Sequence, residues 1–133
     1  MAEGMTAEGM IAMRTCLIVD DSVVIRRVAR RILEGLGFRV AEAVDGEQAI
    51  DLCRSTMPQG ILLDWRMPNM DGYEFLRALR HLPGGEEPKV VFCTTENDVV
   101  SIARALHAGA DEYIMKPFDK EIVTAKLQAV GLA

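Results

Sequence analysis

A small set of acids, a hydroxyl and a lysine follow short apolar runs at widely separated places in the chain. Asp20 and Asp21 come directly after one such run, and Asp64 ends another. Thr94 and Lys116 stand in the same relation to two later runs. If these runs are strands of one parallel sheet, their carboxyl ends form the edge at which such sheets bind ligands. We therefore expect the five side chains to line one crevice.

The chemistry of this set points to a divalent cation and a phosphoryl group. Three carboxylates in one crevice repel one another, so a cation must offset them or one pKa must rise. Oxygen ligands suit Mg²⁺, which commonly uses one or two carboxylates with phosphate and water. Lys116 can pair with a phosphate oxygen, and the Thr94 hydroxyl can donate to another. The carboxylate of Asp64 can act as a nucleophile and form an aspartyl phosphate.

Each of these motifs also has a plain structural interpretation. An acidic pair at the end of a strand often caps a helix, and Asp21 or Ser22 stands where the first helix is expected to begin. A lysine before a proline is typical of a turn, and a pair of threonines is typical of a loop. The joint occurrence of these groups after neighbouring strands favours the metal and phosphate chemistry over the separate structural readings.

The elements that must position these residues follow from the hydrophobic pattern. Short apolar runs predict strands at Thr15–Val19, 38–43, 60–63, 89–93 and 113–115. Apolar residues at helical spacing predict helices at 22–36, 47–56, 73–82, 98–108 and 119–130. This alternation predicts an α/β fold in which a doubly wound parallel sheet is covered by helices on both faces. In the strand order 2-1-3-4-5, strands 1 and 3 are neighbours, which brings the acids together.

Length and composition limit the classes of protein. The chain has 133 residues, which predicts one domain, and its net charge of -5 argues against nucleic acid as the main partner. The sequence contains no apolar stretch long enough to span a membrane and does not begin like a signal peptide. Its three cysteines lack the spacing of a metal site, which favours reduced thiols and a cytoplasmic location. We expect residues 1–13 to be a flexible extension and residues 14–133 to be the domain.

Four segments together resemble the receiver domains of two-component response regulators, in particular the single-domain, CheY-like members. The segments are LIVDDS at 17–22, LLDWRMPNMDG at 62–72, Thr94 with its neighbour, and KPF at 116–118. Their spacing also fits, with 30 positions from Asp64 to Thr94 and 52 from Asp64 to Lys116. The resemblance covers nearly the whole chain and implies a flavodoxin-like (βα)5 fold.

The resemblance also implies a role for each site residue. Asp64 is similar to the phosphoacceptor, and Asp21 to the acid that binds Mg²⁺ directly. Asp20 is similar to the partner acid, which often acts through water. Arg66 stands where the backbone carbonyl ligates the metal. The cofactor implied is Mg²⁺.

Three further roles follow from the resemblance. Thr94 is similar to the switch hydroxyl, Lys116 to the lysine that pairs with the phosphoryl group, and Tyr113 to the aromatic that changes rotamer on activation. The bond between Lys116 and Pro117 is typically cis in this family. The protein is then a signalling switch that catalyses only its own phosphorylation and dephosphorylation.

The partners implied are a histidine kinase or a histidine phosphotransfer protein, and a downstream protein target. The first predicted helix carries two pairs of arginines at i,i+4, which would form one broad basic face: Arg26, Arg27, Arg30 and Arg31. In relatives this helix meets the kinase or phosphotransfer helices, whereas the plain alternative is a solvated helix face. We expect a monomer that binds neither nucleic acid nor a membrane. Since the chain stops after its last predicted helix, we expect a stand-alone receiver, and a piece of a larger regulator is the alternative.

Other functions stay open on the sequence alone. The protein can be a phosphate sink or relay intermediate, a constitutive interaction module, or a small phosphohydrolase that uses Asp64 as its nucleophile. Arg66 is a local peculiarity, since many relatives carry a smaller or different side chain there. We hypothesise that Arg66 alters the lifetime of the aspartyl phosphate, and the alternative is an exposed loop arginine.

Overall fold

The computed structural model describes residues 14–95 and 99–133. The flexible extension predicted for residues 1–13 lies outside the described residues, and so does position 98, where the fourth helix was expected to begin. The structure thus describes nearly all of the domain predicted at 14–133.

Within the described residues, five strands form one parallel sheet. They are β2 (Thr15–Val19), β3 (Arg39–Ala43), β4 (Gly60–Asp64), β5 (Lys89–Thr94) and β6 (Glu112–Met115). Their order across the sheet is β3-β2-β4-β5-β6, and each neighbouring pair is parallel. The predicted order 2-1-3-4-5 is therefore confirmed, with the first strand beside the third.

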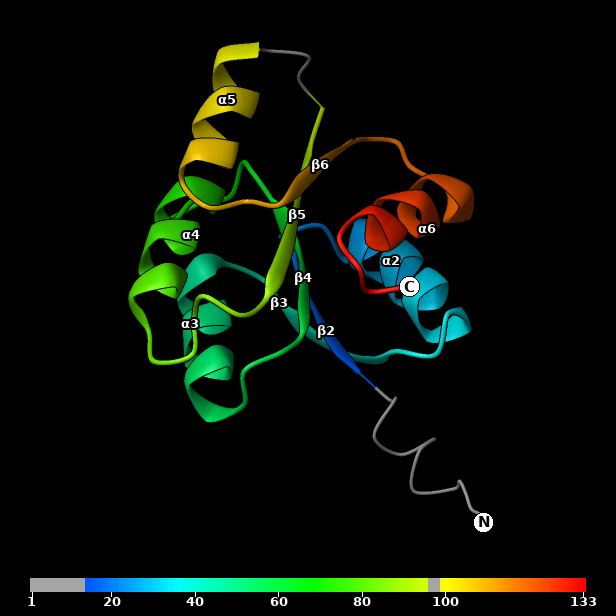
Figure 1. Cartoon of the computed structure of the whole chain (residues 1–133), viewed down its shortest axis with the longest axis horizontal. Coiled ribbons are helices and arrows are strands. Elements are labelled where there is room, and N and C mark those ends of the chain that lie inside the picture. The colour runs from blue at the N-terminus through cyan, green and yellow to red at the C-terminus, as the bar shows by residue number, and fades with distance from the viewer. Residues whose placement is uncertain (1–13, 96–98) are drawn as a thin grey trace.

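Helices cover both faces of this sheet. They are α2 (Val23–Gly35), α3 (Gly46–Ser55), α4 (Gly72–His81), α5 (Val99–His107) and α6 (Lys120–Ala129). Helices α3, α4 and α5 lie on one face, whereas α2 and α6 lie on the other (Figure 1). Alternate strand residues enter two separate cores: Leu17 and Val19 pack on the α3 side, and Cys16 and Ile18 on the α2 side. Burial on both faces explains why the strands read as continuous apolar runs.

Local polar residues begin the helices. The side chains of Ser22, Asp45 and Asp119 each accept a hydrogen bond from the backbone N–H three residues further on. Asp71 does the same, and Glu74 reaches back to complete a capping box. Since the N-cap of α2 is Ser22, the neighbouring Asp21 carboxylate is left to the strand-end cluster.

Strands β4 and β5 each extend one residue further at the carboxyl end than predicted. Asp64 still pairs with Cys93, and Thr94 pairs with Met115, so the parallel ladder continues to both residues. Both side chains are therefore carried on sheet positions, which are more rigid than loop positions.

Two further expectations, on the cysteines and on membrane-spanning segments, can be compared with the structure. The three cysteines are buried free thiols. None of the described helices combines the length and the apolar character that crossing a membrane requires.

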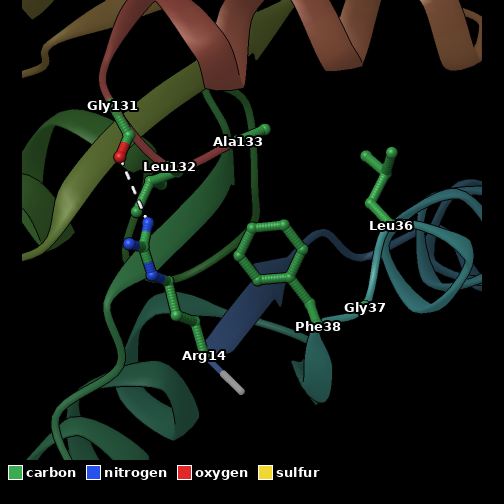
Figure 2. A pocket seen from close by; sticks show the side chains of 7 residues that line it. All are labelled: Arg14, Leu36, Gly37, Phe38, Gly131, Leu132 and Ala133. Carbon is green, nitrogen blue, oxygen red and sulfur yellow. Dashed lines mark hydrogen bonds between the residues drawn. The ribbon is translucent and has the colours of Figure 1, made fainter. Parts of the chain in front are cut away.

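The amino edge of the sheet carries a hollow of its own (Figure 2). Arg14, which precedes β2, donates from Nη1 to the carbonyl oxygen of Gly131 at 3.1 Å, and Phe38 lines the same hollow. The side chains that line it include one cation and no acid. The side chains of this hollow therefore offer no carboxylate to a metal ion.

Candidate functional site

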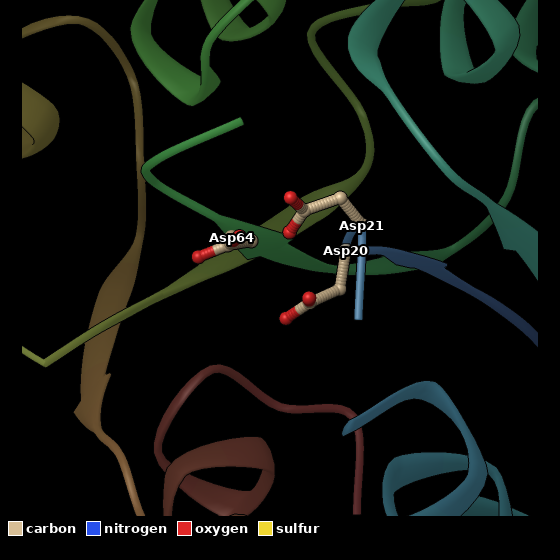
Figure 3. Close-up of side chains that lie close together, drawn as sticks. All are labelled: Asp20, Asp21 and Asp64. Atoms are coloured by element: carbon tan, nitrogen blue, oxygen red, sulfur yellow. The ribbon is translucent and has the colours of Figure 1, made fainter. Parts of the chain in front are cut away.

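Three carboxylates converge at the opposite, carboxyl edge of the sheet. Asp20 and Asp21 follow β2, and Asp64 ends the neighbouring strand β4 (Figure 3). One oxygen from each lies within 4.8 Å of the others. Asp20 is 3% exposed and Asp64 is 7% exposed, whereas Asp21 is open to solvent. The structure thus brings together the three acids that the strand order predicts to be close.

Asp20 is held at several of its polar groups. Its backbone N–H donates to the carbonyl oxygen of Ala43 at 3.1 Å, which ties it to β3. Its Oδ1 accepts from the backbone N–H of Ser22 at 2.8 Å, and its Oδ2 accepts from Lys116. The start of the cluster is therefore a fixed point of the fold.

Lys116 bridges two of the acids. Its Nζ donates to Asp20 Oδ2 at 2.8 Å and to Asp64 Oδ1 at 3.1 Å. Burial by itself lowers the pKa of this ammonium, but the two carboxylates outweigh that effect and the pKa is raised. Lys116 is therefore a fixed positive charge at the centre of the site, and its bond to Pro117 is cis, as the resemblance implies.

One lysine does not neutralise three acids. Burial, and next the charge of Asp20, raise the pKa of Asp64 to about 6, although Lys116 and the backbone N–H of Arg66 act in the opposite direction. The cluster therefore carries negative charge that its own residues do not offset. All of its donor atoms are carboxylate oxygens, the ligands that a hard cation such as Mg²⁺ takes. The residues present fit that ion.

Thr94 and Tyr113 lie on the two strands beyond β4. Thr94 is buried, and its carbonyl oxygen accepts from the backbone N–H of Lys116 at 2.9 Å. Tyr113 is half-buried, with its ring centroid 5.9 Å from that of Phe92. From the outside, Lys126 Nζ lies 4.8 Å from the Tyr113 centroid. Thr94 thus ends the strand beside β6, and Tyr113 lies on β6 itself, the strand that Lys116 follows.

A tight turn closes the site after Asp64. The backbone N–H of Gly72 donates to the carbonyl oxygen of Trp65 at 3.1 Å. A Cβ on Gly72 would lie 2.7 Å from the carbonyl oxygen of Asp64, so only glycine fits there. Asn69 takes a φ of 69°, a left-handed conformation that asparagine tolerates. The segment after β4 therefore turns back and passes close to Asp64.

Arg66 lies within this turn, and its side chain is exposed. It lines an open hollow together with Arg104 and Asp71. Its backbone N–H bonds to the carboxylate of Asp64. The metal-ligating role of its carbonyl oxygen stays a prediction.

The predicted basic face of the first helix is divided by the structure. Arg26 Nε donates to Glu42 Oε1 at 2.9 Å, and Arg30 Nε donates to Glu42 Oε2 at 2.5 Å. Arg27 and Arg31 point outward and are exposed. The prediction that all four arginines form one broad face was therefore wrong, because Glu42 on β3 binds Arg26 and Arg30.

Glu42 is the residue near the site that the motifs did not identify. The hydrogen bond from Arg30, and next that from Arg26, lower its pKa against the effect of burial. Glu42 lies on β3, the strand that pairs with β2, at a position that faces α2. Val40 on the same strand also faces α2. The sequence did show an acid within an apolar strand. To predict its pairing with the arginines, however, one must know which helix packs over that strand.

Comparison with known proteins gives one family. Residues 16–128 match the model of the response regulator receiver domain. The response regulator MprA of Mycolicibacterium vanbaalenii is 38% identical over 114 residues, which are 86% of this chain and 48% of that protein. The phosphate regulon transcriptional regulatory protein PhoB of Klebsiella pneumoniae is 34% identical over 117 residues, 88% of this chain and 51% of that protein. The chain thus spans about half the length of these relatives.

Solved structures agree with this family in fold and length. The chemotaxis protein CheY4 of Vibrio cholerae has a TM-score of 0.85 at 31% identity, covering 89% of this chain and 98% of that one. The receiver domain of the sensor histidine kinase PA1611 of Pseudomonas aeruginosa has a TM-score of 0.81 at 30% identity, covering 88% and 96%. That structure is described as holding a magnesium ion in its active site cleft. With the strand order, the acid cluster and the family match in agreement, this chain belongs to the response regulator receiver domain family.

Proposed function

We propose that Asp64 accepts the phosphoryl group, and that the carboxylates of Asp20, Asp21 and Asp64 hold Mg²⁺ together with the backbone carbonyl of Arg66. One observation carries this proposal: three carboxylates lie within 4.8 Å of one another, and Lys116 bridges two of them. The magnesium ion described in the cleft of the PA1611 receiver supports the choice of cation.

The chain's own residues account for the transfer. A carboxylate oxygen of Asp64 forms a bond to phosphorus while the bond from phosphorus to the donor breaks, and the donor's imidazole leaves as the phosphohistidine is consumed. Lys116 exchanges its contact with Asp64 for one with a phosphoryl oxygen. The Thr94 hydroxyl donates to another phosphoryl oxygen. Mg²⁺, when bound, would supply positive charge that offsets the carboxylates and the phosphoryl oxygens.

The output is a change at β6 and α5. As Thr94 turns toward the phosphoryl group, the space beside Tyr113 changes, and its ring can adopt a second rotamer against Phe92. Helix α5 presents Val99 and Val100, which are 76% and 66% exposed, and such apolar exposure supports a protein target rather than nucleic acid. We propose that this target reads the position of Tyr113.

The acceptor assignment is tested by intact mass. Full-length protein is mixed with Mg²⁺ and a small phosphodonor, and we expect the mass of one acid-labile phosphoryl group to be added. Asp64→Ala should gain none. An unaltered protein that gains no mass overturns the assignment, whereas sustained release of phosphate from many esters would favour a phosphohydrolase.

The phosphodonor is proposed to be a histidine kinase or a histidine phosphotransfer protein that docks on α2. Arg27 and Arg31 are exposed beside Val24 and Val28, which are 63% and 42% exposed. Together they form a mixed apolar and basic surface next to the exposed Asp21. Such a surface suits an amphipathic helix with acidic side chains.

Charge reversal tests this docking surface. Arg27→Glu with Arg31→Glu should slow phosphotransfer from a phosphorylated phosphotransfer protein and flatten its salt dependence. Phosphorylation by a small phosphodonor should be unchanged, because that donor does not need the surface. Equal slowing with both donors, or no slowing with either, rules out the docking role.

Arg66 is proposed to set the lifetime of the aspartyl phosphate. Its backbone N–H already bonds to Asp64, and its exposed guanidinium can reach solvent at the entrance to the site. Dephosphorylation of Arg66→Ala should therefore differ in rate from that of the unaltered protein. An unchanged rate would leave Arg66 as an ordinary loop residue.

Residues 14–133 are proposed to form the receiver unit, and the family match at 16–128 supports these limits. The buried free thiols of the three cysteines suit a reducing compartment, so we propose a cytoplasmic location. A monomeric state is proposed and is measured directly by light scattering.

A further inference from the structure

Arg26 connects the acid cluster to the neighbouring edge strand. Its Nη1 donates to the backbone carbonyl oxygen of Asp20 at 2.7 Å, and its Nε donates to Glu42 Oε1 at 2.9 Å. The side chain is 13% exposed, although it belongs to the helix that also carries the solvent-facing arginines. Arg26 is thus anchored at both ends of its guanidinium.

The oxygen that Arg26 binds belongs to the peptide group between the two acids. Because a peptide group is planar, the direction of this carbonyl fixes the plane from which the backbone of Asp21 continues. The Asp20 side chain is fixed independently by Ser22 and Lys116. The Asp21 side chain is exposed, so its direction depends on that peptide.

Glu42 keeps the guanidinium in place. Its two carboxylate oxygens are shared between Arg26 and Arg30, and β3 also holds Asp20 through the carbonyl oxygen of Ala43. Adjacent residues of one strand therefore hold the segment with the two acids, one through the backbone and one through Arg26.

We propose that Arg26, braced by Glu42, is a positioning residue for the Mg²⁺ site. It fixes the peptide between Asp20 and Asp21, directs the Asp21 carboxylate toward Asp64, and thereby sets the affinity for Mg²⁺ without contacting the ion. This inference rests on the proposed Mg²⁺ site and adds a residue that the acid cluster itself does not contain.

The sign of one substitution separates positioning from simple electrostatics. A guanidinium near a cation site repels the cation, so its removal would tighten Mg²⁺ binding if charge alone mattered. Removal of a positioning group frees the peptide and weakens binding. Arg26→Met keeps much of the apolar stem and removes both donors, so the two explanations predict opposite results.

The experiment is a Mg²⁺ titration of the full chain, followed by Trp65 fluorescence and by backbone amide NMR shifts. We expect Arg26→Met to raise the Kd by about fivefold or more, since loss of groups that orient metal ligands typically costs about 10–100-fold in affinity. Arg26→Lys keeps the charge but has a single ammonium for two acceptors, so its Kd should fall between those of Arg26→Met and the unaltered protein. Glu42→Ala should also raise the Kd.

Arg54→Ala is the matched control. Arg54 is an arginine of α3 with 63% of its side chain exposed, paired only loosely with Asp51 at 3.6 Å. Its removal should leave the Kd unchanged. Phosphorylation of Arg26→Met by a small phosphodonor should be slow at low Mg²⁺ and approach the normal rate at saturating Mg²⁺, a pattern that a general loss of stability does not produce.

The titration distinguishes failure of this inference from failure of the proposed Mg²⁺ site. If the unaltered protein binds Mg²⁺ and Asp21→Ala abolishes that binding, an unchanged or lower Kd in Arg26→Met overturns this inference alone. If Mg²⁺ binding is absent, or survives Asp21→Ala and Asp64→Ala, the proposed site itself is wrong and this inference fails with it. Should Arg26→Met not fold, Arg26→Lys decides the question through the same titration, because it keeps the charge and a raised Kd then cannot come from electrostatics alone.

Discussion

The negative charge of Asp64 is unfavourable in the fold. Its carboxylate is buried beside Asp20, and these two causes raise its pKa from 3.8 to about 6. The fold thus keeps at its centre an acid that it would hold more easily as a neutral group. Such a perturbed carboxylate is typical of a functional site. A cation or an incoming phosphoryl group would offset the unfavourable charge.

Asp64→Asn should therefore stabilise the metal-free protein at pH 7. The folded-state pKa lies above the unfolded value, so the destabilisation by the ionised carboxylate grows between about pH 4 and pH 6, is complete above about pH 6, and vanishes well below pH 4, where both states are protonated. The expected gain is about 1–3 kcal/mol at pH 7, by the usual 1.36 kcal/mol per pKa unit. Urea denaturation in the presence of a chelator measures it. A gain that is the same at pH 4 and pH 7 would contradict this origin.

Gly72 is the second residue whose identity is fixed by local geometry, because an added Cβ atom would not fit there. A Cβ there would meet the carbonyl oxygen of Asp64 at 2.7 Å and the Cα of Trp65 at 2.9 Å, both backbone atoms. Gly72→Ala should cost about 1–3 kcal/mol, as overpacking does, and should slow phosphorylation because Asp64 must shift. Gly35→Ala is the control, since a Cβ at that helical position meets nothing within 4 Å. We expect Gly35→Ala to be neutral or stabilising in the same denaturation assay.

At the scale of elements, α2 carries two separate tasks. Arg26 and Arg30 turn toward Glu42 on β3, and Arg27 and Arg31 turn to solvent. The division follows from helix geometry, because positions four apart share a face and adjacent positions do not. One face of α2 therefore holds the peptide between the two acids, and the next is the face that we propose for the phosphodonor.

Arg80 joins three segments at the far end of α4. Its guanidinium donates to the carbonyl oxygens of Gly85, Pro88 and Gly109, at 2.9 Å, 2.9 Å and 2.5 Å, and to Asp111 at 3.2 Å. Gly109, with a φ of 116°, leaves room for this side chain. The loop after α4 and the turn before β6 are thus held by one residue.

Arg80→Met should lower the free energy of unfolding by about 2–4 kcal/mol, because it leaves several carbonyl oxygens without their charged donor. The rate of phosphorylation should stay near normal, since Arg80 lies away from the acids. Arg54→Ala, which removes an exposed arginine, should cost at most about 0.5 kcal/mol. A loss in Arg80→Met as small as that of the control would show that water replaces the lost donor.

At the scale of the whole molecule, a row of aromatic rings crosses the α3 side of the sheet next to the site. The row consists of Tyr73, Trp65, Phe92 and Tyr113, with successive centroids 6.0, 5.1 and 5.9 Å apart. Arg104 stacks on the first ring at 4.6 Å, and Lys126 on the last at 4.8 Å. Because this row joins α4 to β5 and β6, and Lys126 of α6 contacts its last ring, we expect a change beside Asp64 to be felt at both ends of the row.

Binding at the acid cluster should therefore stabilise the whole fold. At a Mg²⁺ concentration about 100 times the Kd, linkage predicts a gain of about 2.7 kcal/mol, seen as a rise in Tm. Asp21→Ala should lose most of this rise, while a Mg²⁺-free buffer of matched ionic strength controls for salt. A rise of equal size in Asp21→Ala would show that Mg²⁺ acts elsewhere on the protein.

The fold and the location of the site were predictable from the chain because their signals are local. Continuous apolar runs mark strands buried on both faces, and Asp45, Asp71 and Asp119 each cap a helix through a backbone N–H three residues away. Asp64 ends one of these runs, so its place at the carboxyl edge of the sheet follows from pattern alone. The strand boundary was one residue short there because polarity was taken as the end of the strand, whereas the ladder continues while backbone groups still pair.

Charge pairing, by contrast, was decided by the tertiary structure. Arg26 and Glu42 are 16 positions apart, and Lys116 and Asp20 are 96 positions apart. Helical spacing tells which arginines share a face, but not which carboxylate lies opposite that face once the helix has crossed over the sheet. Since an ion pair depends on a few ångströms between side chains from different elements, the chain alone determined where the acids gather, and packing determined which cations hold them.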